Sequence, residues 1–518
     1  MQFTQGLHRA VQQKPDAVAT SCNDRVRTFA ETGDRVARLA AGFVGLGLTR
    51  ESRICILALN SDRYLEAYLA IAWMGAISVP ANCRWSNAEL IYSINDADCT
   101  ALIVDDQFST AVPALREGCP GLREVIFAGD GPCPEGAIPC EALIGNSPGI
   151  DDVGAHGNDL LGIFYTGGTT GAPKGVMLSH SNICSSSLAM LAEGLFAEGA
   201  RGLHIAPMFH LADMLMIGCL LLRGCEHVML PHFKPDAVFS AIEERRVTDT
   251  LVVPAMLQAL VDHPDIAKRD LGSLRNVLYG ASPASEALIE RATDALPGVG
   301  LMQGYGMTEV AAFLTALPRE MHTPEGRKRN KLRSAGRAGY HVQLRVVDAE
   351  DREVPRGTIG EIIARGPNIM QGYLNKPEAT GEALRNGWMH TGDLAYMDDD
   401  GYVFIVDRLK DMIISGGENV YSTEVENAIA RHPAVASCAV VGIPCDEMGE
   451  KVHAAIVLKS GMSLTLDELR EHCRTLIAGY KCPRSLVIVD ALPLSGAGKI
   501  LKTALRAPYW REVDRAAG

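Results

Sequence analysis

The sequence predicts an α/β protein with largely parallel sheets, followed by regions built from shorter strands. The main observation is that helical patterns alternate with short apolar runs through most of the chain. Apolar residues recur with helical spacing over residues 28–46 and 64–74, and buried strands are expected at residues 53–59 and 101–104. From about Gly339 the pattern changes to short strands separated by polar turns. That change predicts an antiparallel or barrel-like lobe after the α/β part.

The same strand pattern returns at residues 204–206, 250–253 and 277–279. The longest apolar stretch, residues 211–222, contains an aspartate and is too short to span a bilayer, so a buried helix is expected there. Residues 409–518 hold a glycine-rich loop, two helical patterns and two β runs. This last stretch has the size of a separate small domain.

The composition is that of a globular protein, with 47% hydrophobic and 21% charged residues in a chain of 518. The formal net charge of −13 argues against a nucleic-acid binder, which needs a basic face. The 14 cysteines show no C-x-x-C spacing, and no H-E-x-x-H motif occurs, so a zinc site held by the protein is not expected. The first residues form no apolar signal segment, which favours a reducing cytoplasm.

The strongest local signal is the glycine-rich run at residues 164–175, which follows an apolar strand pattern. The backbone N–H groups of Gly167, Gly168 and Gly171 can point at a phosphate chain, and Lys174 adds a positive charge. The lysine spacing is not that of a Walker A loop. A plain glycine-rich hairpin is the alternative for this run taken alone.

Four further residues suit nucleotide chemistry. Tyr305 offers an aromatic face to a purine, and Glu309 is a suitable carboxylate for Mg²⁺. Asp393 can accept hydrogen bonds from two ribose hydroxyls, although a turn residue is the alternative. Arg408 can reach a ribose or a phosphate, with a solvated surface arginine as the alternative.

Together these segments resemble the motif series of the adenylate-forming superfamily, which includes acyl-CoA synthetases, peptide-synthetase adenylation domains and beetle luciferases. The resemblance covers nearly the whole chain, and six motifs occur in the family's order. They lie at residues 164–175, 280–282, 303–309, 391–393, 407–419 and 492–499.

The resemblance implies a two-domain architecture. A large N-terminal domain, residues 1–408, is expected to contain two α/β sheet subdomains and a β-barrel-like lobe. A small, mobile α+β domain follows at residues 409–518, with a hinge at Lys410.

The resemblance also implies a set of site residues. The residues expected to bind ATP or AMP are Thr166, Gly167, Gly168, Thr169, Thr170, Gly171, Lys174, Gly280, Ala281, Ser282, Gln303, Gly304, Tyr305, Gly306, Met307, Thr308, Asp393, Arg408 and Lys499. The hinge and coenzyme A loop comprise Lys410, Ser415, Gly416 and Gly417. The acyl pocket is assigned to His210, Leu211, Met214, Pro254, Gly280, Gly304 and Met307. The metal ligands are Glu309 and Thr169, and the catalytic set is Lys499, Thr166, Lys174, His210 and Glu309.

One position departs from the family pattern. Family members usually have serine where this chain has Gly167, so one hydroxyl donor to the phosphates is missing. The backbone N–H remains, and function is expected to be retained.

The resemblance predicts an AMP-forming acyl-CoA synthetase that uses ATP, Mg²⁺ and coenzyme A and proceeds through an acyl-adenylate. The main alternative is a free-standing adenylation enzyme that loads an acyl or amino acid onto a carrier protein. Luciferase-type oxidation is a weaker alternative. A non-catalytic nucleotide sensor would be marked by loss of Glu309 or Lys499, and both are present.

The acid itself is less defined. The segments expected to line its pocket, residues 211–215, 254–257, 279–283 and 302–307, are apolar and offer no basic partner for a second carboxylate. A medium- or long-chain fatty acid or an aromatic acid, such as a cinnamate or benzoate, is therefore expected. No nucleic-acid partner and no transmembrane segment are expected, and the protein is expected to be a monomer or homodimer.

Overall fold

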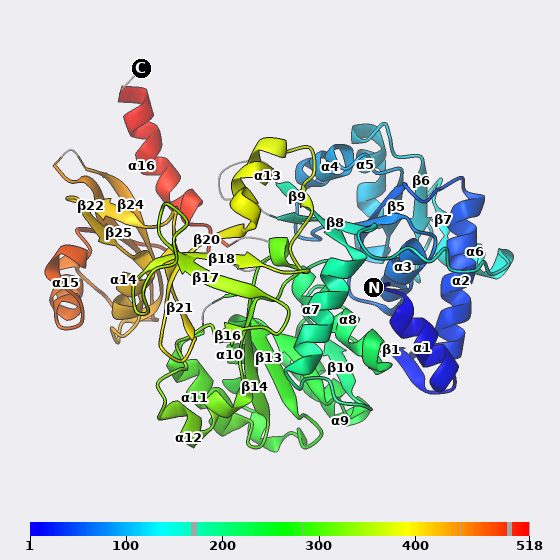
Figure 1. Ribbon diagram of the computed structural model, residues 1–518, viewed down its shortest axis with the longest axis horizontal. Coiled ribbons are helices and arrows are strands. Elements are labelled where there is room, and N and C mark those ends of the chain that lie inside the picture. The colour runs from blue at the N-terminus through cyan, green and yellow to red at the C-terminus, as the bar shows by residue number, and fades with distance from the viewer. Residues whose placement is uncertain (167–172, 283, 446, 495–499, 517–518) are drawn as a thin grey trace. The chain divides into compact units, whose positions relative to one another are not determined.

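The computed structural model describes residues 1–166, 173–282, 284–445, 447–494 and 500–516, with side chains to residue 510 (Figure 1). The chain forms two compact units. The first contains Met1–Thr166, Pro173–Leu344 and Ala364–Met389, and the second contains Arg345–Ile363 and the residues from His390 onward. The mixed α/β class with a large and a small part is confirmed, and the predicted hinge at Lys410 stays a prediction.

A nine-stranded sheet forms one half of the first unit. Its strand order is β16-β15-β14-β13-β12-β10-β11-β1-β2, and the strands from β14 to β1 run parallel. The strands are β1 (Val18–Cys22), β2 (Arg25–Thr28), β10 (Arg201–His204), β11 (Glu226–Met229), β12 (Asp249–Val252), β13 (Asn276–Gly280), β14 (Gly300–Tyr305), β15 (Thr315–Leu317) and β16 (Arg337–Ala338).

An eight-stranded sheet forms the other half, in the order β19-β9-β8-β4-β3-β5-β6-β7. Its strands are β3 (Arg53–Leu57), β4 (Ile77–Pro80), β5 (Ala101–Val104), β6 (Glu124–Phe127), β7 (Ile138–Pro139), β8 (Leu160–Thr166), β9 (Lys174–Ser179) and β19 (Gly372–Tyr373). The predicted strands and the helix–strand alternation of this half are confirmed.

Helices α7 (His180–Ala192) and α8 (Leu211–Arg223) contact the cores of both sheets. Ile183 and Met214 belong to the core that includes β8 and β9, whereas Met190 and Met216 pack with β12, β13 and β14. A helix that is apolar on all sides is stable between two layers, which explains the apolar stretch seen in the sequence. A Cβ at Gly218 would lie 2.2 Å from Oγ of Ser187, so glycine lets the two helices approach closely.

The remaining helices of the first unit connect the strands. They are α1 (Gln5–Gln13), α2 (Phe29–Gly45), α3 (Asp62–Trp73), α4 (Asn87–Asp96), α5 (Val112–Gly118), α6 (Cys140–Asn146), α9 (Pro235–Arg245), α10 (Pro254–Val261), α11 (Glu286–Ala295), α12 (Pro324–Arg327) and α13 (Pro377–Ala383). Thr28 and Glu31 form a capping box at the start of α2, which fixes the helix where the sequence pattern places it. No described helix is both long and apolar enough to cross a membrane.

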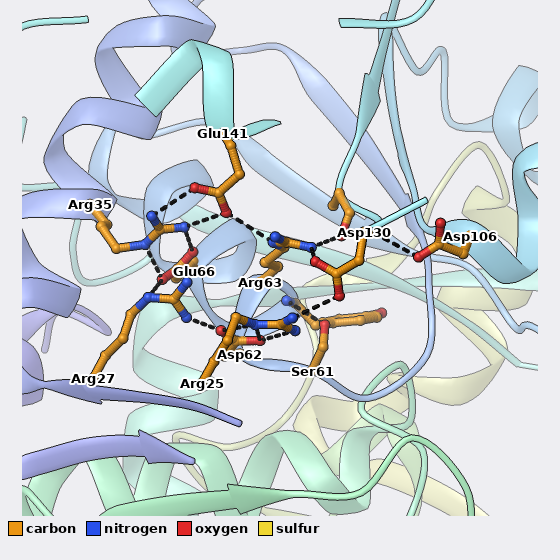
Figure 2. Close-up of polar contacts among 12 residues, drawn as sticks. Arg25, Arg27, Arg35, Ser61, Asp62, Arg63, Glu66, Asp106, Asp130 and Glu141 are labelled. Atoms are coloured by element: carbon orange, nitrogen blue, oxygen red, sulfur yellow. Dashed lines mark hydrogen bonds and ion pairs between the residues drawn. The ribbon is translucent and has the colours of Figure 1, made fainter. Parts of the chain in front are cut away.

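A closed ring of ion pairs ties together β2, α2, α3, α6 and the segment after β6 (Figure 2). The ring has eight ion pairs, and in seven of them the nitrogen–oxygen distance is 2.7–3.6 Å. The eighth pair joins Arg27 and Asp62. Because each charge has two partners of opposite sign, the buried members Asp62, Arg63 and Glu66 are compensated. The order around the ring is Arg25, Asp62, Arg27, Glu66, Arg35, Glu141, Arg63 and Asp130.

The second unit holds a five-stranded sheet and most of a four-stranded sheet. The four-stranded sheet has the order β17-β18-β20-β21, with β17 (Gln343–Val347), β18 (Gly360–Arg365), β20 (Met389–Met397) and β21 (Val403–Arg408). The five-stranded sheet contains β22 (Ile413–Ser415), β23 (Glu418–Val420), β24 (Val435–Cys445), β25 (Gly449–Leu458) and β26 (Ser485–Ile488). Helices α14 (Ser422–Ile429), α15 (Leu466–Arg474) and α16 (Lys502–Ala516) complete this unit.

All 14 cysteines are free, and most are buried. Burial raises the pKa of thiols such as Cys140 and Cys184, each to about 12. The buried cysteines act as small apolar core residues.

Candidate active site

The predicted nucleotide and acid segments of the first unit follow neighbouring parallel strands. Pro254 comes after β12, residues 280–282 come at the end of β13, and residues 303–305 end β14. Since β12, β13 and β14 are adjacent and parallel, their carboxyl ends meet at one edge of the nine-stranded sheet. In open α/β sheets, ligands bind outside this edge. The structure therefore brings together three segments that lie far apart in the sequence.

Glycine is required where the backbones of β13 and β14 meet. Gly280 pairs with Gly304, and a Cβ on Gly280 would lie 2.3 Å from the carbonyl oxygen of Gly304. A Cβ on Gly306 would lie 2.3 Å from the carbonyl oxygen of Ala312. Ala281 has φ +66°, a left-handed conformation that costs energy in a residue with a Cβ. The predicted adenine segment is therefore tightly packed and strained.

Three of the predicted acid-pocket residues, His210, Leu211 and Met214, lie at the start of α8. His210 is the N-cap of this helix, and its Nδ1 accepts a 3.4 Å hydrogen bond from the backbone N–H of Ala212. Leu211 and Met214 are buried in the first turns, and Pro254 is buried at the start of α10. Met307 packs partly buried against the same core as Leu211 and Met214.

The predicted phosphate loop joins β8 to β9. These two strands are antiparallel, with Thr166 opposite Lys174. The Thr166 hydroxyl donates a 3.4 Å hydrogen bond to the backbone oxygen of Lys174. The strand that the sequence predicts before the loop is confirmed. The remaining loop residues of the prediction, Gly167, Gly168, Thr169 (also a predicted metal ligand), Thr170 and Gly171, lie outside the described residues.

Glu309, the other predicted metal ligand, lies in a 3₁₀ turn, η3 (Thr308–Val310), and is 7% exposed. Its Oε1 accepts a 2.8 Å hydrogen bond from the hydroxyl of Tyr373, a residue that the sequence reasoning missed. Within the described part of the chain, no three His, Cys, Asp or Glu side chains form a metal cage. A single buried carboxylate suits Mg²⁺, which keeps several waters and takes its other ligands from substrate phosphates. Glu309 therefore fits the predicted ion.

Tyr373 also contacts the predicted phosphate lysine. The Nζ of Lys174 lies 4.9 Å from the centroid of the Tyr373 ring, within the range of a cation–π contact. The only sequence signal for this residue is the short run Gly-Tyr-Leu-Asn at residues 372–375, which is weak taken alone.

In the second unit, Asp393 on β20 lies directly across from Arg408 on β21. Arg408 Nε is 3.1 Å from Oδ1 of Asp393, whose side chain is 6% exposed. The backbone N–H of Asp393 donates a 3.1 Å hydrogen bond to the hydroxyl of Thr391, and Gly392 between them has φ +71°. The structure thus brings the two predicted ribose-site residues together on neighbouring strands.

The predicted coenzyme A loop is the tight turn between β22 and β23. Ser415 lies opposite Glu418, and Gly416 and Gly417 have φ +63° and +83°, which favours glycine at both positions. The backbone N–H of Gly416 donates a 2.8 Å hydrogen bond to the oxygen of Met448. The predicted hinge residue, Lys410, has its carbonyl bonded by Nη1 of Arg506 on α16, at 3.0 Å.

Lys499, the predicted catalytic lysine, lies outside the described residues. Three positions further on, Lys502 begins α16 and joins a buried polar network that the sequence reasoning missed. Its Nζ contacts Oγ of Ser422 at 2.6 Å and Oε1 of Glu426 at 2.7 Å. The Ser422 hydroxyl in turn donates a 2.9 Å hydrogen bond to Asp407. Burial raises the pKa values of the Asp407 and Glu426 carboxyls, and Lys502 opposes this effect at both.

His204, which carries no motif, lies in a buried chain of hydrogen bonds. Its Nδ1 is 2.8 Å from Oδ2 of Asp213, and its Nε2 is 3.0 Å from Nδ1 of His227. Burial lowers the pKa of His227 well below its ordinary value. The backbone N–H of Asp213 donates a 3.0 Å bond to the oxygen of His210. The chain of side chains thus has a structural role, because it holds the first turn of α8 against β10 and β11.

Comparison with known proteins agrees with this arrangement. Residues 7–374 match the family model of the AMP-binding enzymes, and residues 424–499 match the model of the AMP-binding enzyme C-terminal domain. A feruloyl-CoA synthase from Amycolatopsis sp. is 40% identical over 503 residues, covering 97% of this chain and 98% of the relative.

The names of two further similar proteins give other acids as substrates. A medium/long-chain-fatty-acid–CoA ligase from Mycobacterium tuberculosis is 34% identical, covering 95% of this chain and 87% of the relative. The structure of the o-succinylbenzoate CoA synthetase from Bacillus subtilis with its acyl-adenylate intermediate superimposes with a TM-score of 0.85, at 28% identity, over 96% of this chain and 97% of that one. The chain therefore belongs to the family of AMP-binding enzymes, within the adenylate-forming superfamily.

Proposed function

We propose that this chain is an acid–thiol ligase that converts a carboxylic acid, ATP and coenzyme A into an acyl-CoA, AMP and pyrophosphate. The observation that carries the proposal is that a buried acid, Glu309, and a lysine, Lys174, contact the same tyrosine, Tyr373. An acid and a cation at this place suit a metal–triphosphate substrate. The likeness to a feruloyl-CoA synthase and to a fatty-acid–CoA ligase supports coenzyme A as the acceptor.

The reaction has two steps. An oxygen of the acid's carboxylate attacks the α-phosphorus of ATP, and the bond to pyrophosphate breaks. Coenzyme A then loses its thiol proton to solvent, its thiolate sulfur attacks the carbonyl carbon of the acyl-adenylate, and the bond to AMP breaks. Such displacements depend mainly on positioning and on neutralisation of charge.

Different residues of the chain position the substrates and neutralise their charge. Thr166 and Lys174 orient the phosphates, Glu309 holds Mg²⁺, and Asp393 with Arg408 binds the ribose. Mg²⁺, when bound, neutralises charge on the phosphates. Lys499 serves the first step.

In the second step, the turn at residues 415–417 guides coenzyme A. The hinge at Lys410 separates the two steps, with residues 409–518 as the moving part.

The acid that we propose is aromatic and of the cinnamate kind. The predicted pocket residues are apolar or glycine except for His210, and none is a lysine or arginine that would neutralise a second carboxylate. Two of them, Gly280 and Gly304, carry no side chain, so a flat ring can lie against their backbone. The 40% identity to a feruloyl-CoA synthase favours an aromatic acid over a fatty acid.

The test is release of AMP and pyrophosphate with Mg²⁺ and ATP across cinnamates, benzoates, fatty acids and amino acids, with and without coenzyme A. The expected result is catalytic AMP release that requires coenzyme A and is fastest with a cinnamate. If AMP release is fastest with a fatty acid, the proposed acid is wrong but the proposed reaction stands. If each enzyme molecule forms pyrophosphate only once and coenzyme A does not accelerate the reaction, coenzyme A is not the acceptor. The alternative, a carrier protein as acceptor, would then be favoured.

A further inference from the structure

Tyr373 contacts two groups of opposite charge through different parts of its side chain. Its hydroxyl donates a 2.8 Å hydrogen bond to Oε1 of Glu309, and its ring lies 4.9 Å from Nζ of Lys174. Burial, followed by the Glu309 carboxylate, raises the pKa of the Tyr373 hydroxyl. The hydroxyl is the donor in this bond, because the carboxylate oxygen of Glu309 accepts it.

The backbone around Tyr373 is fixed against the strand that carries Lys174. Strand β19 pairs antiparallel with β9, with Tyr373 opposite Val176. The backbone N–H of Leu374 donates a 2.8 Å hydrogen bond to the oxygen of Gly175. The N–H of Tyr373 itself donates to the Thr380 hydroxyl at 2.9 Å. These bonds fix the position of the Tyr373 backbone, and so the point from which its ring extends, relative to Lys174, the first residue of β9.

The same segment is bonded to the turn that carries Glu309. The backbone N–H of Met370 donates a 2.9 Å bond to the oxygen of Glu309. The buried side chain of Asn368 donates two 3.0 Å bonds, to the oxygens of Val310 and Phe313. Residues 368–374 therefore connect the turn after β14, in one sheet, to β9 in the other. Tyr373 belongs to this segment and contacts both Glu309 and Lys174.

We propose that Tyr373 is a positioning residue for the metal–phosphate subsite, with its hydroxyl orienting Glu309 toward Mg²⁺ and its ring orienting Lys174 toward the phosphates. This assignment rests on the proposed function, because that function places Mg²⁺ at Glu309. Among the described residues, no donor contacts Oε2 of Glu309. The Tyr373 bond thus occupies one carboxylate oxygen and aims the other at a ligand.

The two contacts have separable consequences. Removing a hydrogen-bond partner of a metal ligand lowers metal affinity by about 10–100-fold. Removing an aromatic face from a lysine affects the position of its charge, and hence phosphate binding, with a smaller effect of about two- to tenfold. Tyr373→Phe removes the first contact and keeps the second, whereas Tyr373→Leu removes both.

The experiment measures ATP-induced thermal stabilisation of the full chain while Mg²⁺ is titrated, a binding readout that does not need turnover. Tyr373→Phe should raise the Mg²⁺ concentration for half-maximal stabilisation by about tenfold. At saturating Mg²⁺, its KM for ATP should stay within about twofold of wild type because the ring remains over Lys174. Tyr373→Leu should show the same Mg²⁺ shift and a KM for ATP several-fold higher.

Ser21→Ala is the control. The Ser21 hydroxyl on β1 also donates to a carboxylate, Glu226, at 2.6 Å, and lies outside the predicted site residues. Its loss should leave the Mg²⁺ titration unchanged. In a Glu309→Gln background, Tyr373→Phe should cause no further shift, because the bond acts through Glu309.

An unchanged Mg²⁺ titration in Tyr373→Phe would overturn the proposal, as would an equal shift in Ser21→Ala. So would a wild-type chain that Mg²⁺ and ATP together do not stabilise. If the wild type binds ATP with Mg²⁺ but releases no pyrophosphate with any acid, the proposed function fails. The Tyr373 assignment is then still decided by the titration.

Discussion

Nε of Arg408 lies 3.1 Å from Oδ1 of Asp393, directly across two antiparallel strands of the second unit. This pairing fixes one oxygen of a carboxylate that we assign to the ribose hydroxyls. Asp393→Asn should raise the KM for ATP by about 10–100-fold, because a hydrogen bond to a charged group contributes about 1.5–3 kcal/mol. Steady-state kinetics with ATP as the varied substrate measures this change.

The surface pair of Asp348 and Arg352 provides the control for this variant. Asp348 Oδ2 lies 2.9 Å from Nε of Arg352 in the same unit, outside the predicted site. Asp348→Asn should leave the KM for ATP unchanged. Equal effects of the two substitutions would remove the ribose assignment from Asp393.

The glycines at residues 280 and 304 should respond differently to alanine. A Cβ on Gly304 would meet only side-chain atoms, Leu278 Cδ1 at 3.5 Å and Met190 Cε at 3.9 Å, so Gly304→Ala should fold normally. It narrows the predicted acid pocket and should raise the KM for an aromatic acid about tenfold, with little change for ATP.

Gly280→Ala should instead lower the free energy of unfolding by about 1–3 kcal/mol, because its Cβ would collide with the Gly304 carbonyl oxygen. Urea unfolding measures this loss of stability. If Gly304→Ala left the KM for every acid unchanged, Gly304 would not line the pocket.

Lys499→Ala should separate the two half-reactions. Loss of a positive charge that acts in the transition state of adenylation should slow pyrophosphate release by about 10²–10³-fold. Thioester formation from a pre-made acyl-adenylate should change only a few-fold. Single-turnover assays of each step measure the two rates.

Lys459→Ala, which removes an exposed lysine of the second unit, is the control and should affect neither step. Equal losses in both half-reactions of Lys499→Ala would contradict the restriction of Lys499 to adenylation.

The ion-pair ring should make stability depend on acid pH. Hydrogen bonds from Arg35, with Arg63 contributing further, lower the pKa of Glu141 from 4.5 to about 2. A depressed folded pKa means that the stabilising contribution is present above the unfolded value and is lost as pH falls from about 4.5 toward 2. Glu141 is 45% exposed, so solvent screening reduces the effect.

The difference in unfolding free energy between wild type and Glu141→Gln should therefore be positive at neutral pH and shrink below about pH 4.5. Urea unfolding at several pH values measures it. Glu117→Gln, which changes an exposed carboxylate outside the ring, should show no such trend. A difference that stays constant with pH would contradict the role of this pair in the ring.

Much of the fold follows from local patterns. The apolar run at residues 211–222 predicts a buried helix, and α8 is that helix. The capping box at Thr28 and Glu31 and the buried strands β3 and β5 fall where their residue types place them. These features are predictable because each depends on residues within one or two turns of the chain.

The contacts of the site are less accessible to such reasoning. Tyr373 and Glu309 are 64 residues apart, and the bond between them depends on a two-residue strand at the edge of a sheet. The Lys502–Ser422 contact spans 80 residues and joins two helix starts. Short edge strands and buried polar networks carry no periodic signal, so their partners are set by packing of distant segments.

The sequence by itself determined the α/β class, the order of the motifs and the chemical types that suit a nucleotide, a hard cation and an apolar acid. The tertiary structure alone decided which of these groups meet: Gly280 with Gly304, Arg408 with Asp393, and Tyr373 with both Glu309 and Lys174. The physical reason is that side-chain chemistry and periodicity are local properties. Strand order, register and close packing arise only when distant segments bury their apolar surfaces together.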